Sequence, residues 1–171
     1  TGNTDIPIDA NVCTDQVTRY RWHDLLLLDT PGVQAGEPDH DALTGKAILD
    51  ADLLVFVITG ELFSDVSAGY FRRLVFERGK AVQTLLVVNK MTLDSGTPEI
   101  KRPDIDAVCR PKSSHDFGTT FIDAQCYLES LGATSRRDAS ELRDVSQFDT
   151  FGEQLNSFAL NRCDLARLVS P

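Results

Sequence analysis

Long apolar runs alternate along the chain with segments whose apolar residues recur at helical spacing. Three runs are apolar throughout and predict strands: LLLLD at 25–29, DLLVFVITG at 52–60 and VQTLLVVNK at 82–90. A continuous apolar run with β-branched residues is typical of a strand buried on both faces. Two further strands are predicted, VTRYRW at 17–22 and TTFIDA at 119–124.

The segments between these strands predict helices. Residues 41–51 and 64–80 have helical spacing, and the second segment starts with a serine cap and ends near a glycine stop. A helical pattern returns over residues 145–168. Residues 92–117 are polar, contain three prolines and predict at most one short helix. The expected apolar positions of the second and last helices are Phe71, Leu74 and Val75, and then Phe148, Phe151, Leu155 and Phe158.

This alternation of strands and helices predicts the fold class. We expect an α/β fold whose mostly parallel sheet is covered by helices on both faces, giving three layers. In such sheets ligands bind beyond the carboxyl ends of the strands. The candidate site is therefore formed by the polar residues that directly follow the apolar strands: DTPG, TGE, NKM and DAQ.

Composition narrows the class of ligand. The chain has 171 residues with 42% hydrophobic residues, enough for one domain with a core, and its net charge is −9. That charge argues against nucleic acid or an anionic membrane as a partner, although it does not exclude a small nucleotide. No apolar run is long enough to span a bilayer and no signal peptide is visible. Together with thiols that fit a reducing compartment, this leads us to expect a cytoplasmic protein. Free thiols are expected, because no CxxC pair occurs among Cys13, Cys109, Cys126 and Cys163.

Two polar motifs carry most of the functional argument. Residues 29–32 (DTPG) and 89–91 (NKM) each end a predicted buried strand. Each motif alone is weak, because an acid before Pro-Gly is also an ordinary turn and Asn and Lys commonly end strands. The two together are stronger, since they would lie on one edge of the sheet with a single strand–helix unit between them.

With these motifs the chain resembles the G domain of a P-loop GTPase, closest to bacterial dynamin-like GTPases and more distantly to Era-type GTPases. DTPG matches the DxxG motif, NKM matches the first part of the NKxD base-recognition motif, and DAQ at 123–125 lies where the family has its SAK motif. The phrases VITGELF, VVNKM and FIDAQCYLES favour the dynamin-like branch. The resemblance implies a partial G domain within residues 1–165, with 166–171 starting an exit segment toward a following region.

For the phosphate end of the site, the resemblance implies a Mg²⁺-dependent GTPase that forms GDP and phosphate. Asp29 would hold the ion through water, and Thr14 would coordinate it when switch I closes. Thr18 competes with Thr14 for this role, but it falls inside a predicted strand. Gly32 lacks a Cβ, so its backbone N–H can approach a γ-phosphate closely. The loop 33–41 would be switch II.

For the base end, the resemblance points to residues after the last two strands. Asn89 can hydrogen-bond a purine, and the Lys90 stem can pack along the base plane. Asp123 and Ala124 occupy the first two SAK positions, and Ala124 would give its backbone N–H to the guanine oxygen.

The chain departs from the family pattern in three ways. No GxxxxGK[ST] loop occurs, so we expect N-terminal truncation that removes the first strand and the phosphate-binding loop and leaves this fragment inactive alone. Thr92 stands where NKxD has its acid. Either Asp94 takes over the contact of this acid with the guanine, or the selectivity for guanine is weakened, and both alternatives stay open. Val33 stands where many GTPases place a Gln to orient the attacking water, so the water-positioning group is unnamed.

The rival reading is a non-catalytic pseudo-GTPase that serves as an interaction module, supported by Thr92 and the absent phosphate loop. A third reading, an ATP-using P-loop protein, gains from Thr92 and loses from the Asn and Lys at 89–90. The expected partners of the GTPase are a guanine nucleotide and a second copy of the G domain. A membrane would be reached only through regions outside this chain, and no nucleic acid is expected.

Overall fold

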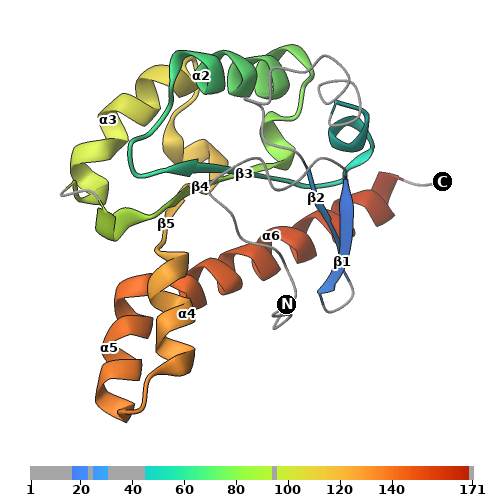
Figure 1. Ribbon diagram of the computed structural model, residues 1–171. Coiled ribbons are helices and arrows are strands. Elements are labelled where there is room, and N and C mark those ends of the chain that lie inside the picture. The colour runs from blue at the N-terminus through green and yellow to red at the C-terminus, as the bar shows by residue number, and fades with distance from the viewer. Residues whose placement is uncertain (1–16, 23–24, 31–44, 94–95, 170–171) are drawn as a thin grey trace. The chain divides into compact units, whose positions relative to one another are not determined.

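The computed structural model of the chain describes residues 17–22, 25–30, 45–93 and 96–169 (Figure 1). Contacts between residues divide the chain into two units, Thr1–Asp52 and Leu53–Pro171. Each unit is described by itself below.

The first unit contains an antiparallel pair of strands. β1 (Thr18–Trp22) pairs with β2 (Leu25–Asp29), so that Thr18 lies opposite Asp29, and residues 45–50 form a short helix. The described strands therefore form two sheets rather than the single, mostly parallel sheet expected from the sequence. The hydrogen bonds of β2 go to its neighbour in the hairpin, and Leu26 is exposed, so the expected burial of this strand on both faces is wrong.

The second unit is built on a parallel sheet with the order β3-β4-β5. β3 (Leu54–Thr59) and β4 (Thr84–Asn89) pair along their full length, and the two-residue β5 (Thr120–Phe121) pairs with the end of β4. The predicted strand over 119–124 is therefore shorter than expected, because the chain leaves the sheet to start a helix directly after Ile122.

Burial differs between the two long strands. β4 is buried from Thr84 to Val88, as its apolar run predicts. β3 alternates instead: Phe56 and Ile58 are buried, whereas Val57 between them is 57% exposed. Only the face that carries Phe56 is covered by the helix that follows, so the prediction of a two-sided buried strand is wrong for β3.

The predicted helix over 64–80 is two elements. α2 (Asp65–Arg72) starts at Ser64, whose side chain accepts a hydrogen bond from the Ser67 N–H at 3.2 Å, as expected of an N-cap. The helix then widens into one π-helical turn, η1 (Arg73–Glu77), and Gly79 follows in the left-handed region with φ of +70°. A 3₁₀ turn, η2 (Ala81–Gln83), leads into β4.

Four aromatic rings tie α2 to its surroundings. Phe71 is 0% exposed, and its ring centroid lies 5.1 Å from that of Phe56 and 5.2 Å from that of Phe63. On its other side it meets Phe117 edge-on at 5.4 Å. Phe71 therefore links the sheet, the loop after β3 and the segment before β5. Leu74 and Val75 are buried too, which confirms the predicted apolar side of this helix.

The segment 92–117 contains more structure than its sequence predicts. It holds the 3₁₀ turns η3 (Met91–Leu93) and η4 (Ser114–Phe117) around a twelve-residue helix, α3 (Pro98–Cys109). Pro98 occupies the first turn of α3, where its missing N–H costs nothing. The buried positions of α3 are Lys101, Ile105 and Cys109. Because the first of these buried positions is a lysine, the apolar residues alone do not show the helical periodicity of this polar segment.

Arg72 stabilises the end of α3. Its Nη1 donates to the carbonyl oxygens of Val108 at 2.7 Å and Arg110 at 2.8 Å, and its guanidinium lies over the ring of Phe76. A cation that binds the last carbonyls of a helix satisfies groups that have no partner inside the helix. Arg72 therefore joins the end of α2 to the end of α3.

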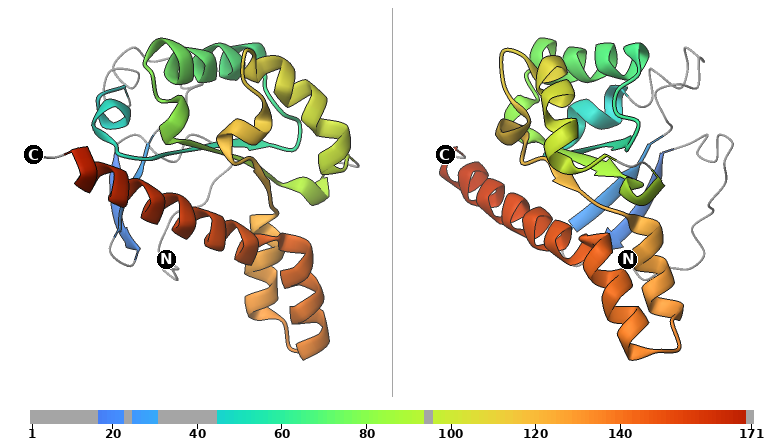
Figure 2. Two further views of the ribbon diagram at one scale, coloured as in Figure 1. Left: turned by 180° about the vertical axis from the view of Figure 1, so that it is seen from behind. Right: turned by 90° about the vertical axis from the view of Figure 1, so that its left-hand side faces the viewer.

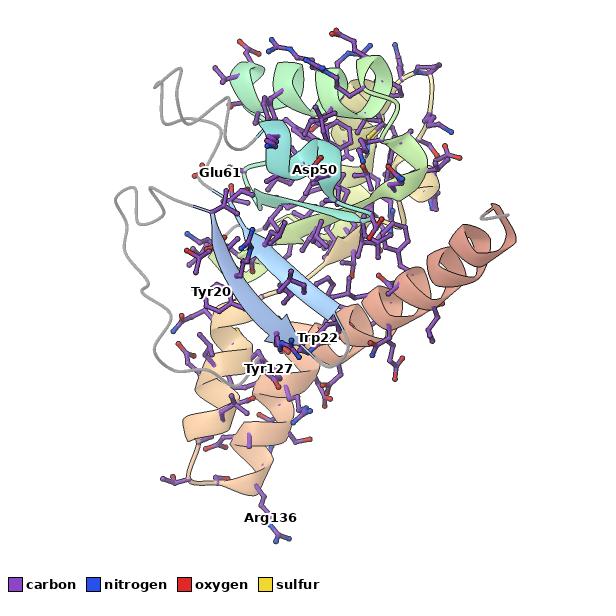
Figure 3. The ribbon with its side chains drawn as sticks, turned by 90° about the vertical axis from the view of Figure 1, so that its right-hand side faces the viewer. Tyr20, Trp22, Asp50, Glu61, Tyr127 and Arg136 are labelled. Carbon is purple, nitrogen blue, oxygen red and sulfur yellow. The ribbon has the colours of Figure 1, made fainter. Side chains whose placement is uncertain are left out.

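Three helices follow β5: α4 (Ala124–Gly132), α5 (Arg136–Ser146) and α6 (Phe148–Val169). Only α6 was expected from the sequence. Tyr127 of α4 (labelled in Figure 3) stacks on Phe148 with a centroid distance of 4.3 Å, which holds the start of α6 against α4. Figures 1 and 2 show α2 and α3 on one side of the β3–β4–β5 sheet and these three helices on the other.

We predict that Cys109 is chemically inert in the folded protein. Burial, together with the nearby charge of Asp106, raises the pKa of its thiol to about 12. Since the thiolate is the reactive form and an ordinary cysteine has a pKa near 8.5, iodoacetamide at about pH 8 should label Cys109 at least about a hundredfold more slowly in the native protein than in urea. Mass spectrometry of the labelled peptide measures both rates, and equal rates would contradict this placement.

Candidate functional site

The end of β4 is joined to the start of α4 by one side chain. Asn89 ends the strand, and its Oδ1 accepts the Lys90 N–H at 2.7 Å and the Ala124 N–H at 3.0 Å. Lys90 adopts a left-handed backbone conformation with φ of +61°, and its side chain is exposed. The side-chain carbonyl of Asn89 thus holds together two segments that lie 35 residues apart, at the carboxyl edge of the sheet.

The second polar centre is Asp123, which is only 1% exposed. As the N-cap of α4, it accepts the Gln125 N–H at 3.0 Å and the Cys126 N–H at 3.1 Å on Oδ1. Its Oδ2 accepts the Thr92 N–H at 3.0 Å and the Thr92 hydroxyl at 2.6 Å. The backbone N–H of Asp123 donates to the carbonyl oxygen of Ser146 at 2.9 Å, which connects the site to the end of α5.

These contacts decide the charge of Asp123. Burial by itself would raise the pKa of this carboxyl group. The hydrogen bonds from Thr92, Cys126 and Gln125 outweigh the burial and hold the pKa below its ordinary range. The buried carboxylate is therefore ionised at neutral pH, and its charge is stabilised by four donors.

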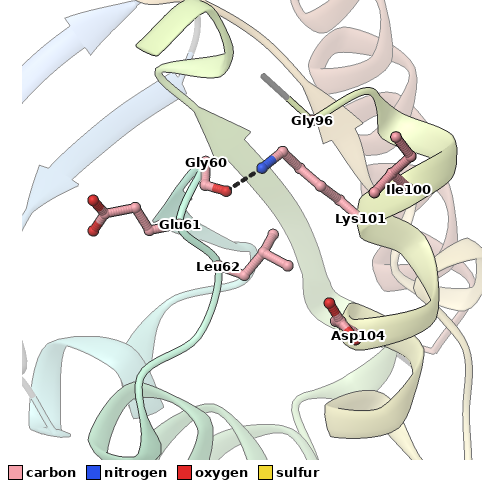
Figure 4. A pocket seen from close by; sticks show the side chains of 7 residues that line it. All are labelled: Gly60, Glu61, Leu62, Gly96, Ile100, Lys101 and Asp104. Carbon is pink, nitrogen blue, oxygen red and sulfur yellow. Dashed lines mark hydrogen bonds between the residues drawn. The ribbon is translucent and has the colours of Figure 1, made fainter. Parts of the chain in front are cut away.

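A cleft of about 400 Å³ lies beyond the end of β3 (Figure 4). The loop after the strand forms one side with Gly60, Glu61 and Leu62. The other side is formed by Gly96, which precedes α3, and by three residues of the helix: Ile100, Lys101 and Asp104. The buried Lys101 ammonium donates to the carbonyl oxygen of Gly60 across the cleft. Lys101 thus anchors α3 to the TGE segment that the sequence marks as a strand end.

The structure places the remaining predicted residues as follows. Asp29 is exposed at the end of β2, and Thr18 is the first residue of β1, inside a strand as expected. Thr14, Gly32 and Asp94 lie outside the described residues. Asp29 and Asn89 belong to different units, so their position on one shared edge stays a prediction. Among the described residues, no group of three or more His, Cys, Asp or Glu side chains is arranged to hold a metal ion.

Neither a protein-family model nor a curated protein sequence matches this chain. A solved structure titled LeoA bacterial dynamin GTPase from ETEC is similar, with a TM-score of 0.60 and 15% sequence identity. The likeness shows a distant G-domain-like fold. It covers 91% of this chain but 31% of the LeoA chain, so the chain spans about a third of that protein.

The G-domain-like unit brings the predicted base-binding residues together. Asn89, Lys90, Asp123 and Ala124 all lie at the carboxyl ends of β4 and β5. The sequence did not indicate that Thr92 would bind Asp123. The available signal was an acid directly before the helical segment AQCYLES, since such an acid caps a helix and needs donors around it. Where the structure describes the chain, no helix is both long and apolar enough to cross a bilayer.

We predict that the Asn89 carbonyl oxygen is needed for the fold at this edge. Asn89→Ala leaves the Lys90 and Ala124 N–H groups without their acceptor, so the free energy of unfolding should fall by about 1–3 kcal/mol. Asn89→Asp is the matched control, because a carboxylate oxygen can still accept both bonds. Urea unfolding followed by circular dichroism compares the two. The assignment fails if both variants unfold at the same urea concentration as the unmodified protein.

Proposed function

We propose that this chain is part of a dynamin-like domain that binds GTP with Mg²⁺ and hydrolyses it to GDP and phosphate. The observation that carries the proposal is the hydrogen bond between Ala124 N and Asn89 Oδ1. It joins the NKM segment, which resembles the first part of the NKxD motif, to the DAQ segment, which lies where the G domain has its SAK motif. Both segments lie at the edge where a parallel sheet binds ligands. The distant likeness to LeoA, titled a bacterial dynamin GTPase, supports the same class.

In this proposal the purine lies against the loops after β4 and β5. Asn89 and the exposed Lys90 side chain hold it, and Lys90 packs its stem along the base. The Ala124 N–H is already donated to Asn89. It would therefore have to share or exchange that bond in order to donate to the guanine oxygen. Asp94 stays a candidate for the base edge.

The phosphate end of the proposed site uses Asp29, Thr14 and Gly32. The Asp29 carboxylate ends its strand and is exposed, which fits the oxygen ligand that Mg²⁺ prefers, directly or through water. Bound there, the ion would neutralise β- and γ-phosphate charge. Thr14 would complete its coordination, and Gly32 would donate its N–H to the γ-phosphate. We further propose that a second G domain supplies the group that orients the attacking water, because the apolar Val33 cannot do so. Any membrane would be reached through other parts of the protein.

Calorimetric titration with GTP, GDP and ATP in the presence of Mg²⁺ tests the proposal. It should be run on this chain and on the longest form that its reading frame encodes, called the full-length protein below. We expect the full-length protein to bind GTP and GDP and to release phosphate from GTP. If a folded full-length protein binds none of the three nucleotides, the proposed function is wrong.

The competing proposal is an interaction module that has the fold without turnover. The hydroxyl that stands in place of the NKxD acid favours it, because Thr92 donates inward to Asp123 rather than toward a ligand. This account predicts a folded full-length protein with no Mg²⁺-dependent phosphate release at any GTP concentration. Measurable release that depends on Mg²⁺ would exclude it.

A further inference from the structure

Positions 92 and 123 have exchanged an acid and a hydroxyl relative to the motifs that this chain resembles. NKxD has its acid at position 92 and SAK has its serine at position 123, whereas this chain has Thr92 and Asp123. The two side chains are in direct contact, with the Thr92 hydroxyl donating to Asp123 Oδ2 at 2.6 Å. The pair therefore contains one acid and one hydroxyl, as the same two motif positions do. In this chain, however, the hydroxyl is on the NKM segment and the acid is on the DAQ segment.

The exchange changes what each group can do. A carboxylate offers about four lone-pair positions, and the two Asp123 oxygens already accept four hydrogen bonds. All four come from the protein itself, and the side chain is 1% exposed. Asp123 therefore has neither the access nor the remaining capacity to accept the N1–H and exocyclic N–H of a guanine. Thr92 presents a neutral oxygen, whose hydrogen is committed to Asp123.

We propose that Thr92 and Asp123 form an exchanged acid–hydroxyl pair that fixes the two base-binding loops and, in doing so, leaves the site with weak selectivity for guanine. This inference rests on the proposed nucleotide-binding function and names the breadth of its substrate class: purine nucleoside triphosphates rather than GTP alone. Asp123 is a positioning residue, since it acts by holding Thr92 and the first turn of α4. Thr92 is the residue that limits selectivity.

The weak selectivity follows from the strength of the hydrogen bonds involved. Bonds from a ligand N–H to a carboxylate are about twice as strong as those to a neutral acceptor. An adenine lacks the two donors that such a carboxylate would read. Thr92 is itself exposed, so the acceptor at this position is open to a ligand. A free carboxylate at position 92 therefore rejects adenine, because the bound base would cover the charge without donating to it. With a neutral Thr92 oxygen there, that rejection is lost, and GTP and ATP should bind with affinities within about tenfold of each other.

Restoring the family residue at one position alone should fail. Thr92→Asp would put a second carboxylate against Asp123 Oδ2 and remove the hydroxyl that stabilises its charge, so two like charges would meet at a contact that is only partly open to water. Asp123→Ser alone would remove the carboxylate oxygen that accepts both the Thr92 hydroxyl and the Thr92 N–H, and the shorter serine side chain has a single neutral oxygen. The double variant Thr92→Asp/Asp123→Ser restores an acid and a donor in contact, and serine still caps α4 well.

The test uses the full-length protein in four forms: unmodified, Thr92→Asp, Asp123→Ser and the double variant. Urea midpoints are measured for each form, and affinities for GTP and ATP are measured by calorimetry with Mg²⁺. We expect both single variants to unfold at lower urea concentration and the double variant to recover most of the loss. Its preference for GTP over ATP should rise at least about tenfold above that of the unmodified protein, the effect of one charged hydrogen bond.

Two further variants serve as controls for the exchanged pair. Thr92→Ser keeps the hydroxyl and should match the unmodified protein in both measurements. Asp94→Ala tests whether the neighbouring acid reads the base: a large loss of preference for GTP would overturn the proposal in favour of Asp94. A single Thr92→Asp variant that gains guanine preference without loss of stability would also overturn it, because Asp123 would then not be committed to Thr92.

Failure of the pair and failure of the proposed function give different results. If the unmodified protein is folded and binds neither GTP, GDP nor ATP, the nucleotide site is wrong and the selectivity inference falls with it. The urea midpoints still report on the contact in that case, since a recovery in the double variant needs no ligand. If the loss of urea midpoint in the double variant equals the sum of the losses in the two single variants, the two residues do not act as a pair, and the proposed exchange is wrong.

Discussion

Replacement of Phe71 by alanine is expected to lower the free energy of unfolding by about 3–5 kcal/mol, the usual cost of removing a fully buried phenylalanine ring. Phe71 is 0% exposed and lies at the centre of a cluster, within 5.4 Å of three other rings between ring centroids. The loss has two parts, the burial of the ring and the cavity that remains between rigid neighbours. Edge-to-face contacts add to the cost, because the partner rings lose them as well.

Val66→Ala is the matched control for Phe71→Ala. Val66 lies on the same helix, but its side chain is exposed, so its truncation should change the unfolding free energy by no more than about 0.5 kcal/mol. Urea unfolding of both variants gives the comparison. Equal midpoints for the two would mean that the aromatic cluster does not hold α2 on the sheet.

Under the proposed function, Asp29→Ala should lower Mg²⁺-dependent GTP hydrolysis by the full-length protein at least about a hundredfold, since even residues that only orient a metal ligand change activity about 10–100-fold. The fold should survive, because Asp29 is the last residue of β2 and its side chain is exposed. Phosphate release measured over a range of Mg²⁺ concentrations shows whether the defect lies in use of the metal.

Asp50→Ala controls for a general loss of surface charge. Asp50 (labelled in Figure 3) is an exposed acid in the short helix 45–50 of the same unit, and none of the motifs includes it. Its replacement should leave turnover within about twofold, as expected of an exposed residue with no role in the site. Turnover that is unchanged in Asp29→Ala would remove Asp29 from the site.

Sequence patterns were most informative where one local rule decides the structure. The apolar runs at 54–59 and 84–89 became neighbouring parallel strands, and the serine at position 64 became a helix cap. The NKM motif indicated where a polar group would follow β4, and Asn89 holds that place. The tendency to form each strand, the helix cap and the position of Asn89 at a strand end depend on residues within one strand or one turn, so the sequence alone carries that information.

Helix α3 shows how a local rule can mislead. The prolines at 98 and 103 suggested breaks, yet the first lies where a helix accepts proline and the second is carried inside the helix. Its buried row begins with Lys101, whose charge is tolerated there because the Gly60 carbonyl oxygen accepts a hydrogen bond from the ammonium. That acceptor comes from a loop 41 residues earlier in the chain, and no window of sequence contains both groups.

By itself, the sequence determined the α/β class, the long strands of the second unit and the residue types at the ends of these strands, because periodicity, β-branched runs and caps act over a few neighbouring residues. Only the tertiary structure decided the partners of those side chains. It placed Thr92 against Asp123, 31 residues away. The Asp123 carboxylate accepts hydrogen bonds from the protein's own donors and has no capacity left for a ligand. The physical reason is that a buried charge must be satisfied by whatever donors the fold brings to it, and those donors are chosen by packing rather than by sequence distance.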